Sequence, residues 1–268
     1  MVQSFLESCQ RLGYIQGQTD HTLFVKHLGS GKIMVLIIYV DDIIITSNHT
    51  EEMNSIKEML ANEFKVKDLS ALKYFLGMEF SRSKKGIFVS QRKYTLDLLN
   101  EIGMLRSRPR KTPIELRDER KMFEGSLVDK GRYQQLVGKL IYLSHTRTNI
   151  AFAVTLVNQY MHDRCQGHLN AVYRILRYLK QTLGKGLFFR KTTERKDEVF
   201  IDVDWAGSVY DRKSTSRYCP MVWGNVVTLR SKKQIVVTRS NTEVEYRAID
   251  HGVFEARIKL FIALDLPA

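Results

Sequence analysis

The chain has 268 residues, 44% of them hydrophobic, and a formal net charge of +13 at pH 7. This composition excludes a disordered tail and allows one large domain or two ordinary ones. The excess of Lys and Arg indicates a polyanionic partner, because each neutralised phosphate releases condensed counterions.

A membrane is the competing partner for a basic chain, but the residues do not favour it. The longest apolar run, Ile33 to Val40, is far below the ~20 residues of a spanning helix, and no signal segment opens the chain. Cys9, Cys165 and Cys219 have no spacing typical of zinc or disulfide frameworks and are interpreted as reduced thiols. We expect an intracellular protein whose compartment the sequence does not reveal.

The first elements in chain order are a helix, a strand hairpin and a second helix. Apolar residues recur at helical spacing from Phe5 to Leu12. Lys32 to Val40 and Ile43 to Thr46 are typical of buried strands, and only the region of an Asp pair separates them. Glu51 to Phe64 carries one apolar stripe, which predicts a helix with Thr50 as its N-cap.

The next elements are two strands, a helix and a basic segment. The strands are predicted at Tyr74 to Ser81 and Gly86 to Ser90, and the helix at Tyr94 to Ile102. Basic residues crowd together with two prolines from Arg106 to Lys121, which indicates a linker or an exposed arm.

The rest of the chain is predicted to form a helical region and then a new unit that starts with strands. The helices are expected over Tyr133 to Ser144, Asn149 to Met161 and His168 to Leu183. The strands are expected over Val199 to Asp204, Ser216 to Val222 and Val226 to Leu229. A closing helix is expected over Ser240 to Leu264, with Ser240 and Glu243 at capping-box spacing.

Asp41 and Asp42 lie side by side between two very apolar strands. At ~4 Å and an effective dielectric near 20, two such charges repel by about 4 kcal/mol, so a cation or solvent must relieve them. Mg²⁺ binds hard oxygen ligands and is often held by carboxylates together with substrate phosphates. The alternative is an ordinary Asp-rich turn.

The segments around this turn resemble the copia-type reverse transcriptases of retrotransposon Pol polyproteins almost from end to end. Those that carry the resemblance are Leu12-Gly13-Tyr14 through Asp20, Leu23-Phe24, Tyr39-Val40-Asp41-Asp42, Phe64 to Phe80, Ser90-Gln91, Lys93-Tyr94, Leu98-Leu99, Tyr133, Leu136-Val137-Gly138, Tyr142-Leu143, Thr146-Arg147, Phe152-Ala153-Val154, Arg174 to Lys180 and Gly186-Leu187. Single segments of this kind are weak signals, whereas a dozen in order are strong.

The resemblance implies roles for residues of the turn and of a following strand. Asp41 and Asp42 would be catalytic, metal-binding carboxylates of the polymerase site, with Asp41 the more direct ligand of Mg²⁺ in a two-ion site. Tyr39 and Val40 would lie near the primer end and the template. Phe75, Leu76 and Gly77 would grip the primer, although Phe75 and Leu76 could instead be plain core residues.

A second carboxylate pair lies at Asp202 and Asp204, which share one face of a predicted strand. It is followed by Asp211 to Ser216, Ser231 to Gln234 and Thr242 to Ala248, and this series looks like the family's ribonuclease H domain.

By this second resemblance Asp202 and Glu245 would be catalytic metal ligands that cut the RNA strand of an RNA–DNA hybrid with Mg²⁺. Asp204 and Glu243 would be supporting or surface residues. Lys232, Lys233 and Arg239 could contact phosphates, or form a solvated basic loop.

Several departures from the family pattern bear on activity. The family's remaining site carboxylates would lie before Met1 and after Ala268. Thr148-Asn149 replaces a usual Pro-Asp, Arg164 a usual Pro, Arg217 a usual Gly and Leu229 a usual Trp. We therefore expect Mg²⁺ to bind weakly or not at all in this chain by itself, and the chain alone to be inactive.

The expected fold is α+β, and the resemblance divides it into four parts. Residues 1–104 would be the C-terminal part of a reverse-transcriptase palm, 105–132 a basic linker, 133–195 a helical thumb or connection, and 196–268 an incomplete ribonuclease H-like domain. The expected partners are an RNA template, a DNA primer, an RNA–DNA hybrid and the rest of the Pol polyprotein, and the family's locations would be a cytoplasmic particle and the nucleus.

Three functions remain open at this point. The first is a segment of an RNA-directed DNA polymerase with ribonuclease H activity. The second is a catalytically dead retrotransposon remnant that retains at most nucleic-acid binding through its positive charge. The third, a host-recruited interaction protein, has no positive feature in its favour.

Overall fold

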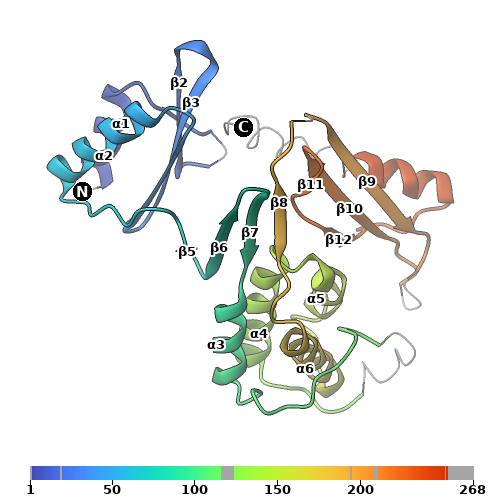
Figure 1. Cartoon of the computed structure of the whole chain (residues 1–268). Coiled ribbons are helices and arrows are strands. Elements are labelled where there is room, and N and C mark those ends of the chain that lie inside the picture. The colour runs from blue at the N-terminus through green and yellow to red at the C-terminus, as the bar shows by residue number, and fades with distance from the viewer. Residues whose placement is uncertain are drawn as a thin grey trace. The chain divides into compact units, whose positions relative to one another are not determined.

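A computed structural model describes residues 2–18, 20–115, 124–193, 195–207, 211–250 and 252. They form two compact units, one within residues 2–72 and the other within residues 73–252 (Figure 1). Helices and strands mix in both units, which confirms the α+β class. The compact units divide after Leu72, whereas the palm assigned by resemblance continues to residue 104.

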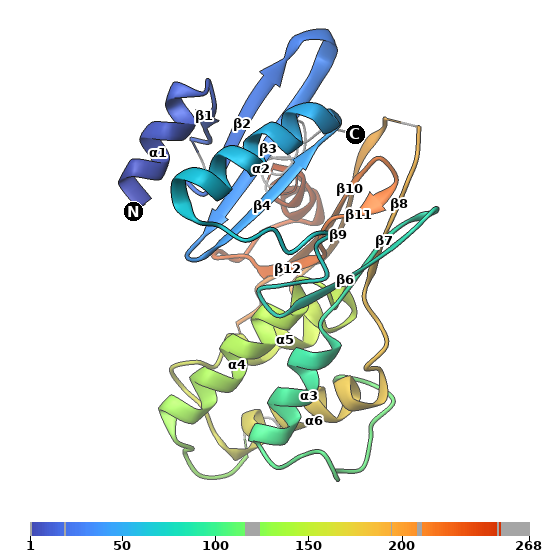
Figure 2. The same ribbon diagram turned by 60° about the vertical axis from the view of Figure 1, so that its left-hand side comes forward.

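The first unit is a four-stranded antiparallel sheet with two helices on one face. Its strands follow chain order: β1 (Ile15–Gln16), β2 (Leu23–Leu28), β3 (Lys32–Tyr39) and β4 (Asp42–Ser47). Its helices are α1 (Val2–Arg11) and α2 (Thr50–Phe64), and Figure 2 shows α2 lying across the sheet. The predicted hairpin is therefore confirmed, and each of its strands is within a residue or so of the expected range.

The core of this unit lies between the sheet and the helices. Seven buried side chains form it, namely Cys9, Tyr14, Phe24, Met34, Leu36, Ile56 and Leu60. The N-cap of α2 is His49, whose Nδ1 accepts a hydrogen bond from the backbone N–H of Glu52 at 3.1 Å. The prediction of Thr50 as the cap was wrong, because an imidazole nitrogen performs the role usually given to a hydroxyl.

The second unit contains two sheets and a helical core. Its first sheet has the order β5 (Tyr74–Phe75), β6 (Met78–Ser83), β7 (Gly86–Ser90) and β8 (Leu187–Arg190). Strand β8 was not predicted and lies within the part of the chain expected to be helical. It pairs with β7 from Gly86↔Arg190 to Val89↔Leu187, so distant segments of the chain close this sheet.

The helical core packs α3 (Arg92–Glu101) against α4 (Lys130–Ser144), α5 (Ala151–Asn158) and α6 (Gln166–Gln181). Leu99, Leu140, Ile175 and Leu176 are each fully buried in it. The helix after the first hairpin of this unit thus shares one core with the predicted thumb helices.

Residues 106–115 of the basic segment have no helix or strand, as predicted, but they lie along α6 rather than free in solvent. The Nζ of Lys180 donates to the carbonyl of Ser107 at 2.6 Å, and Arg174 forms an ion pair with Glu115 at 2.6 Å. The basic residues predicted at 117, 120 and 121 lie outside the described part of the chain.

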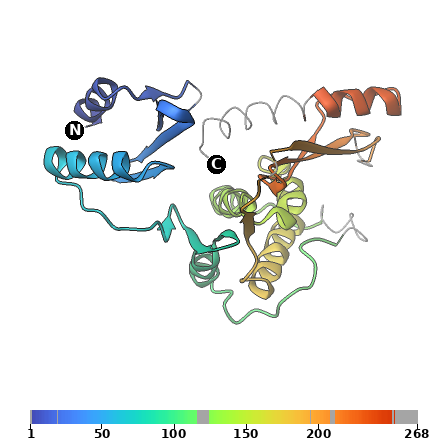
Figure 3. The ribbon, with the colours of Figure 1, turned by 45° about the horizontal axis from the view of Figure 1, so that its top comes forward.

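The second sheet joins β9 (Asp197–Asp204) to β10 (Thr215–Val222), and β10 also pairs with β11 (Asn225–Val226) and β12 (Arg230–Lys233). Figure 3 shows this sheet between the helix of residues 241–250 and the helical core. The predicted strand at Val226 to Leu229 was wrong, since it ends at Val226 and a separate strand begins at Arg230.

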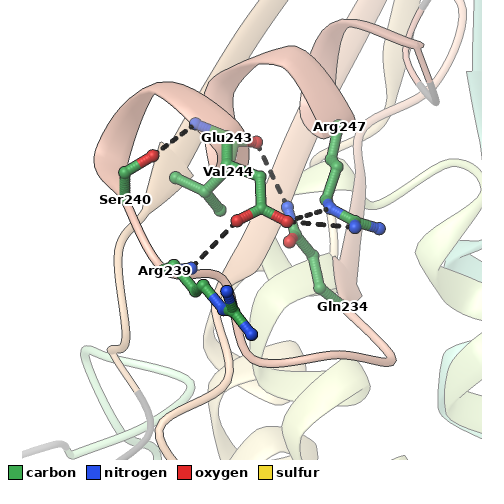
Figure 4. Close-up of polar contacts among 6 residues, drawn as sticks. All are labelled: Gln234, Arg239, Ser240, Glu243, Val244 and Arg247. Atoms are coloured by element: carbon green, nitrogen blue, oxygen red, sulfur yellow. Dashed lines mark hydrogen bonds and ion pairs between the residues drawn. The ribbon is translucent and has the colours of Figure 1, made fainter.

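The helix of residues 241–250 begins with a modified capping box. Ser240 Oγ accepts from the backbone N–H of Glu243 at 3.1 Å, while the Glu243 carboxylate accepts from the backbone N–H of Arg239 at 2.9 Å (Figure 4). The hydrogen bond from Arg239, together with those from Arg247, lowers the pKa of Glu243. The rest of the helix predicted over Ser240 to Leu264 lies outside the described residues.

Candidate functional site

The candidate polymerase carboxylates lie at the tip of the β3–β4 hairpin. Tyr39 pairs with Asp42, so Val40 and Asp41 form a two-residue loop. Both Asp side chains are exposed, and neither forms an ion pair with another described residue. The described residues contain no group of three or more His, Cys, Asp or Glu that could hold a metal, so this site consists of two adjacent carboxylates.

Val40, the residue before this pair, has an unusual backbone conformation. Its φ is +54° and its side chain is 76% exposed. A β-branched residue at positive φ is a true outlier, and such residues concentrate at functional sites, where the surrounding structure holds them in place. Strand pairing on both sides of the loop supplies that constraint.

The candidate primer grip forms a second strained turn, in the other compact unit. Leu76 and Gly77 connect β5 to β6 with φ values of +48° and +74°. The hydroxyl of Tyr142 donates to the carbonyl of Leu76, and a Cβ at Gly77 would approach Cδ2 of Tyr94 to 3.2 Å. Residues of α3 and α4 therefore support a turn whose Leu side chain remains partly exposed.

We predict that Leu76→Asn stabilises this turn. A two-residue hairpin loop with positive φ at both positions prefers Asn-Gly, and a left-handed conformation costs an ordinary residue ~1–2 kcal/mol. The variant should raise the free energy of unfolding by about 1 kcal/mol in chemical denaturation. Phe75→Ala is the comparison and should destabilise, because Phe75 is buried. If Leu76→Asn lowered the free energy of unfolding, the backbone of Leu76 would not be strained as proposed.

The second carboxylate pair is held by a residue that the sequence reading did not place there. Arg217 lies opposite Asp202 in the β9–β10 register, and its Nη1 is 2.8 Å from Asp202 Oδ2. Its Nη2 lies 3.5 Å from Asp204 Oδ2. The only signal for this contact was the departure of Arg217 from the family's usual Gly, because the strand register was not available from sequence.

Glu245 does not join this pair. Ile201 and Tyr218 face the side of the sheet covered by the helix of residues 241–250 and by Gly252, since a Cβ added at Gly252 would lie 2.7 Å from Ile201 Cδ1 and 3.8 Å from Tyr218 Cβ. Side chains alternate along a strand, so Asp202 points to the opposite face of the sheet. The carboxylate of Glu245 instead accepts a hydrogen bond from Asn241 at 3.2 Å.

The three basic residues proposed for phosphate contacts have different surroundings. Lys232 and Lys233 belong to strand β12 and not to a loop. Lys233 forms an ion pair with Asp211 at 2.9 Å, while Lys232 is exposed. Arg239 precedes the helix of residues 241–250.

Arg147 is a buried cation whose hydrogen bonds go to neutral groups. It is 2% exposed, donates to Thr182 Oγ1 at 2.5 Å and to Asn149 Oδ1 at 3.4 Å, and its burial lowers the pKa of the guanidinium. Asn149 also donates to the hydroxyl of Tyr178. This site contains the Thr148-Asn149 departure from the family's Pro-Asp.

Asn149→Asp should stabilise the protein by supplying a carboxylate to Arg147. Hydrogen bonds to charged groups contribute ~1.5–3 kcal/mol, and for a half-buried pair we expect about 1–2 kcal/mol. Arg147 would lower the pKa of the new carboxyl, so the gain is present above the ordinary Asp pKa of about 3.9 and is lost as the pH falls below it. Thermal melts at pH 7 and pH 3 measure this, and an equal gain at both values would contradict the ion pair.

A family model described as "Reverse transcriptase (RNA-dependent DNA polymerase)" matches residues 2–116, which include both strained turns and the Asp41-Asp42 pair. This part of the chain is therefore a reverse-transcriptase-like domain. No solved structure matches the chain significantly, and no helix of the described residues is long and apolar enough to cross a membrane.

Curated relatives extend the likeness beyond this domain. The chain is 38% identical over 239 residues to the "Retrovirus-related Pol polyprotein from transposon RE2" of Arabidopsis thaliana, covering 89% of the chain and 16% of the relative. It is 31% identical over 248 residues to the polyprotein from transposon TNT 1-94 of Nicotiana tabacum, covering 88% and 18%. An uncharacterized mitochondrial protein of Arabidopsis thaliana is 37% identical over 216 residues, covering 81% and 90%.

The chain belongs to the copia-type, retrovirus-related Pol polyproteins of transposons. It spans about a sixth of the length of the full polyproteins it matches. The resemblance to the copia-type reverse transcriptases of retrotransposon Pol polyproteins is confirmed.

Proposed function

We propose that the chain is a segment of an RNA-directed DNA polymerase that acts within a retrotransposon Pol polyprotein and binds a primer–template with its reverse-transcriptase part. The observation that supports this most is the strained turn at residues 39–42, which presents two exposed carboxylates. Ordinary turns do not need a Val at positive φ. The relatives' names identify the polyprotein and transposon context.

The chemistry of Asp41 and Asp42 fits Mg²⁺, which takes hard oxygen ligands and retains several waters when only a few carboxylates bind it. Bound there, Mg²⁺ would supply charge neutralisation for phosphoryl transfer. Asp41, in the loop, would be the more direct ligand of Mg²⁺. The negative charge of Asp42 would attract the ion to the turn. Tyr39 and Val40, both exposed, would lie beside the primer end and the template.

Residues 75–77 would have different roles in primer binding. Phe75 is 8% exposed and belongs to the core, so we propose that it anchors the turn. Leu76 is partly exposed, and Gly77 allows the turn to lie close to the ring of Tyr94. These two residues are the ones that we propose to reach nucleic acid. The strained backbone at Leu76 lowers the stability of the fold, and we propose that it is kept because the turn contacts nucleic acid. Functional sites often carry such a cost in stability.

We also propose that residues 196–268 form a ribonuclease H-like domain. The antiparallel order of β9, β10 and β12, followed by a helix against one face, supports this. Its carboxylates do not fit a metal site in the described structure, because Arg217 binds Asp202 and Asp204. Glu245 bonds to Asn241 of its own helix, which covers the opposite face of the sheet. Lys232 and Arg239 remain candidates for phosphate contacts, and no cleavage step follows from this arrangement.

Primer extension tests the proposal most simply. The Pol polyprotein that carries this chain should extend a DNA primer on an RNA template with Mg²⁺, and the 268-residue chain should bind the same hybrid with an affinity that falls steeply with salt. Hybrid binding without extension by the folded polyprotein would favour a non-catalytic remnant. Binding that does not respond to salt would contradict phosphate recognition altogether.

A further inference from the structure

On the sheet formed by β9, β10 and β12, Arg217 contacts two carboxylates and an aromatic ring. A single guanidinium reaches both Asp202 Oδ2, at 2.8 Å, and Asp204 Oδ2, at 3.5 Å. The backbone N–H of Thr215 adds a hydrogen bond to Asp204 Oδ1. Oxygen atoms of both carboxylates are therefore engaged by donors from the neighbouring strand.

The same guanidinium also contacts the helical core. Arg217 Cζ lies 5.1 Å from the ring centroid of Phe152, which belongs to α5. A second contact, from Thr155 Oγ1 to the carbonyl of Ser231 at 3.1 Å, holds α5 against this part of the sheet. Arg217 is paired with Asp202 on one side and Ser231 on the other. The carboxylates, the guanidinium and α5 thus lie at one face of the sheet, opposite the helix of residues 241–250.

A divalent cation that bound Asp202 Oδ2 and Asp204 Oδ2 together would have to displace the guanidinium that contacts both oxygens. Arg does not lose its charge by deprotonation in proteins, so it would remain beside the ion as a like charge. Its bonds to two carboxylates and its position over an aromatic ring also fix its geometry. The described residues offer no third acidic or His ligand to compensate.

We propose that Arg217 takes the place of a metal ion at Asp202 and Asp204, so that the pair is a cross-strand clamp that joins β9, β10 and α5 instead of a Mg²⁺ site. This inference rests on the proposed ribonuclease H-like domain and on contacts among residues 152–231, and does not depend on the polymerase proposal.

Mn²⁺ binding, followed by the electron paramagnetic resonance signal of the free ion, tests the clamp. The full chain carries Asp41→Asn and Asp42→Asn so that the hairpin carboxylates cannot contribute. With Arg217 present we expect no Mn²⁺ to bind at Asp202 and Asp204 up to about millimolar concentration. Dissociation constants of about this size are typical of weak sites built from oxygen ligands. The Arg217→Gly and Arg217→Gln variants should each gain a site that binds Mn²⁺ at least ~10-fold more tightly than the protein with Arg217. Adding Asp202→Asn to either variant should remove this site.

Arg212→Gly is the matched control, because it removes an exposed Arg at φ +53°, where Gly is well tolerated, a few residues before Arg217. This control should gain no Mn²⁺ site. The proposal is overturned if the Arg217 protein already binds Mn²⁺ in a manner that Asp202→Asn abolishes. It is also overturned if both Arg217 variants keep their circular dichroism spectrum yet gain no site. If neither Arg217 variant folds, Mn²⁺ binding by the protein with Arg217, with and without Asp202→Asn, still tests the proposal.

Discussion

Asp41→Asn is expected to lower Mg²⁺-dependent primer extension by the Pol polyprotein more than about 100-fold. Loss of residues that merely support metal ligands costs ~10–100-fold, so loss of a direct ligand should cost more. The substitution keeps the size of the side chain and removes one charge at an exposed position, so the fold should not change. Initial rates of nucleotide incorporation on an RNA template measure the effect.

Glu58→Gln provides the matched control for this result. Glu58 is exposed on α2 of the same compact unit, and its amide variant also removes one negative charge. We expect its extension rate to stay within about twofold of the unmodified protein, since isolated surface charges contribute little. Equal rates for Asp41→Asn and Glu58→Gln would show that the hairpin carboxylate is not part of the reaction.

Leu140→Ala is expected to have the largest effect on stability. Leu140 is fully buried in the core that α4 shares with α3, α5 and α6. Truncating a buried Leu removes apolar contacts and leaves a cavity, which costs ~2–5 kcal/mol. Hydrogen exchange measured on peptides from α3, α4 and α6 should show faster exchange in all three helices, because they belong to one core.

Leu127→Ala is the comparison, because Leu127 is 73% exposed and its truncation should cost less than about 1 kcal/mol. If Leu140→Ala accelerated exchange in α4 while α3 kept its protection, residues 73–104 would not fold with the helical core. That result would favour the boundary near residue 104 expected from the resemblance over the division after Leu72.

Local patterns in the sequence were sufficient for much of the fold. The β3–β4 hairpin was predicted because aliphatic runs flank a short polar turn, and the helices of the core were predicted because their apolar faces repeat at helical spacing. The Asp41-Asp42 turn was located for the same reason. Its strain was not predicted, since φ at Val40 depends on the two-residue loop that the strand register imposes.

Features that depend on distant pairing were missed. Strand β8 pairs with β7 across about a hundred residues of chain, and a four-residue apolar run gives no signal for that partner. The clamp at Arg217 needs the β9–β10 register, which places it opposite Asp202. Asp202 points away from the helix of residues 241–250, because its neighbour Ile201 and the paired Tyr218 lie on the face next to Gly252. The spacing of Asp202 and Glu245 in the sequence does not reveal that the two carboxylates lie on different sides of the sheet.

The central claim is that the two carboxylate pairs differ, with the hairpin pair open to a metal ion and the β9 pair already bound to a guanidinium. Iron-directed cleavage compares them in one measurement. Fe²⁺ replaces Mg²⁺ in the polyprotein bound to an RNA–DNA primer–template, and ascorbate with peroxide produces radicals that cut the backbone near the bound ion. We predict fragments that end within residues 39–43 and none that end within 200–206. Cleavage at 200–206, or the lack of cleavage at 39–43, would contradict the claim.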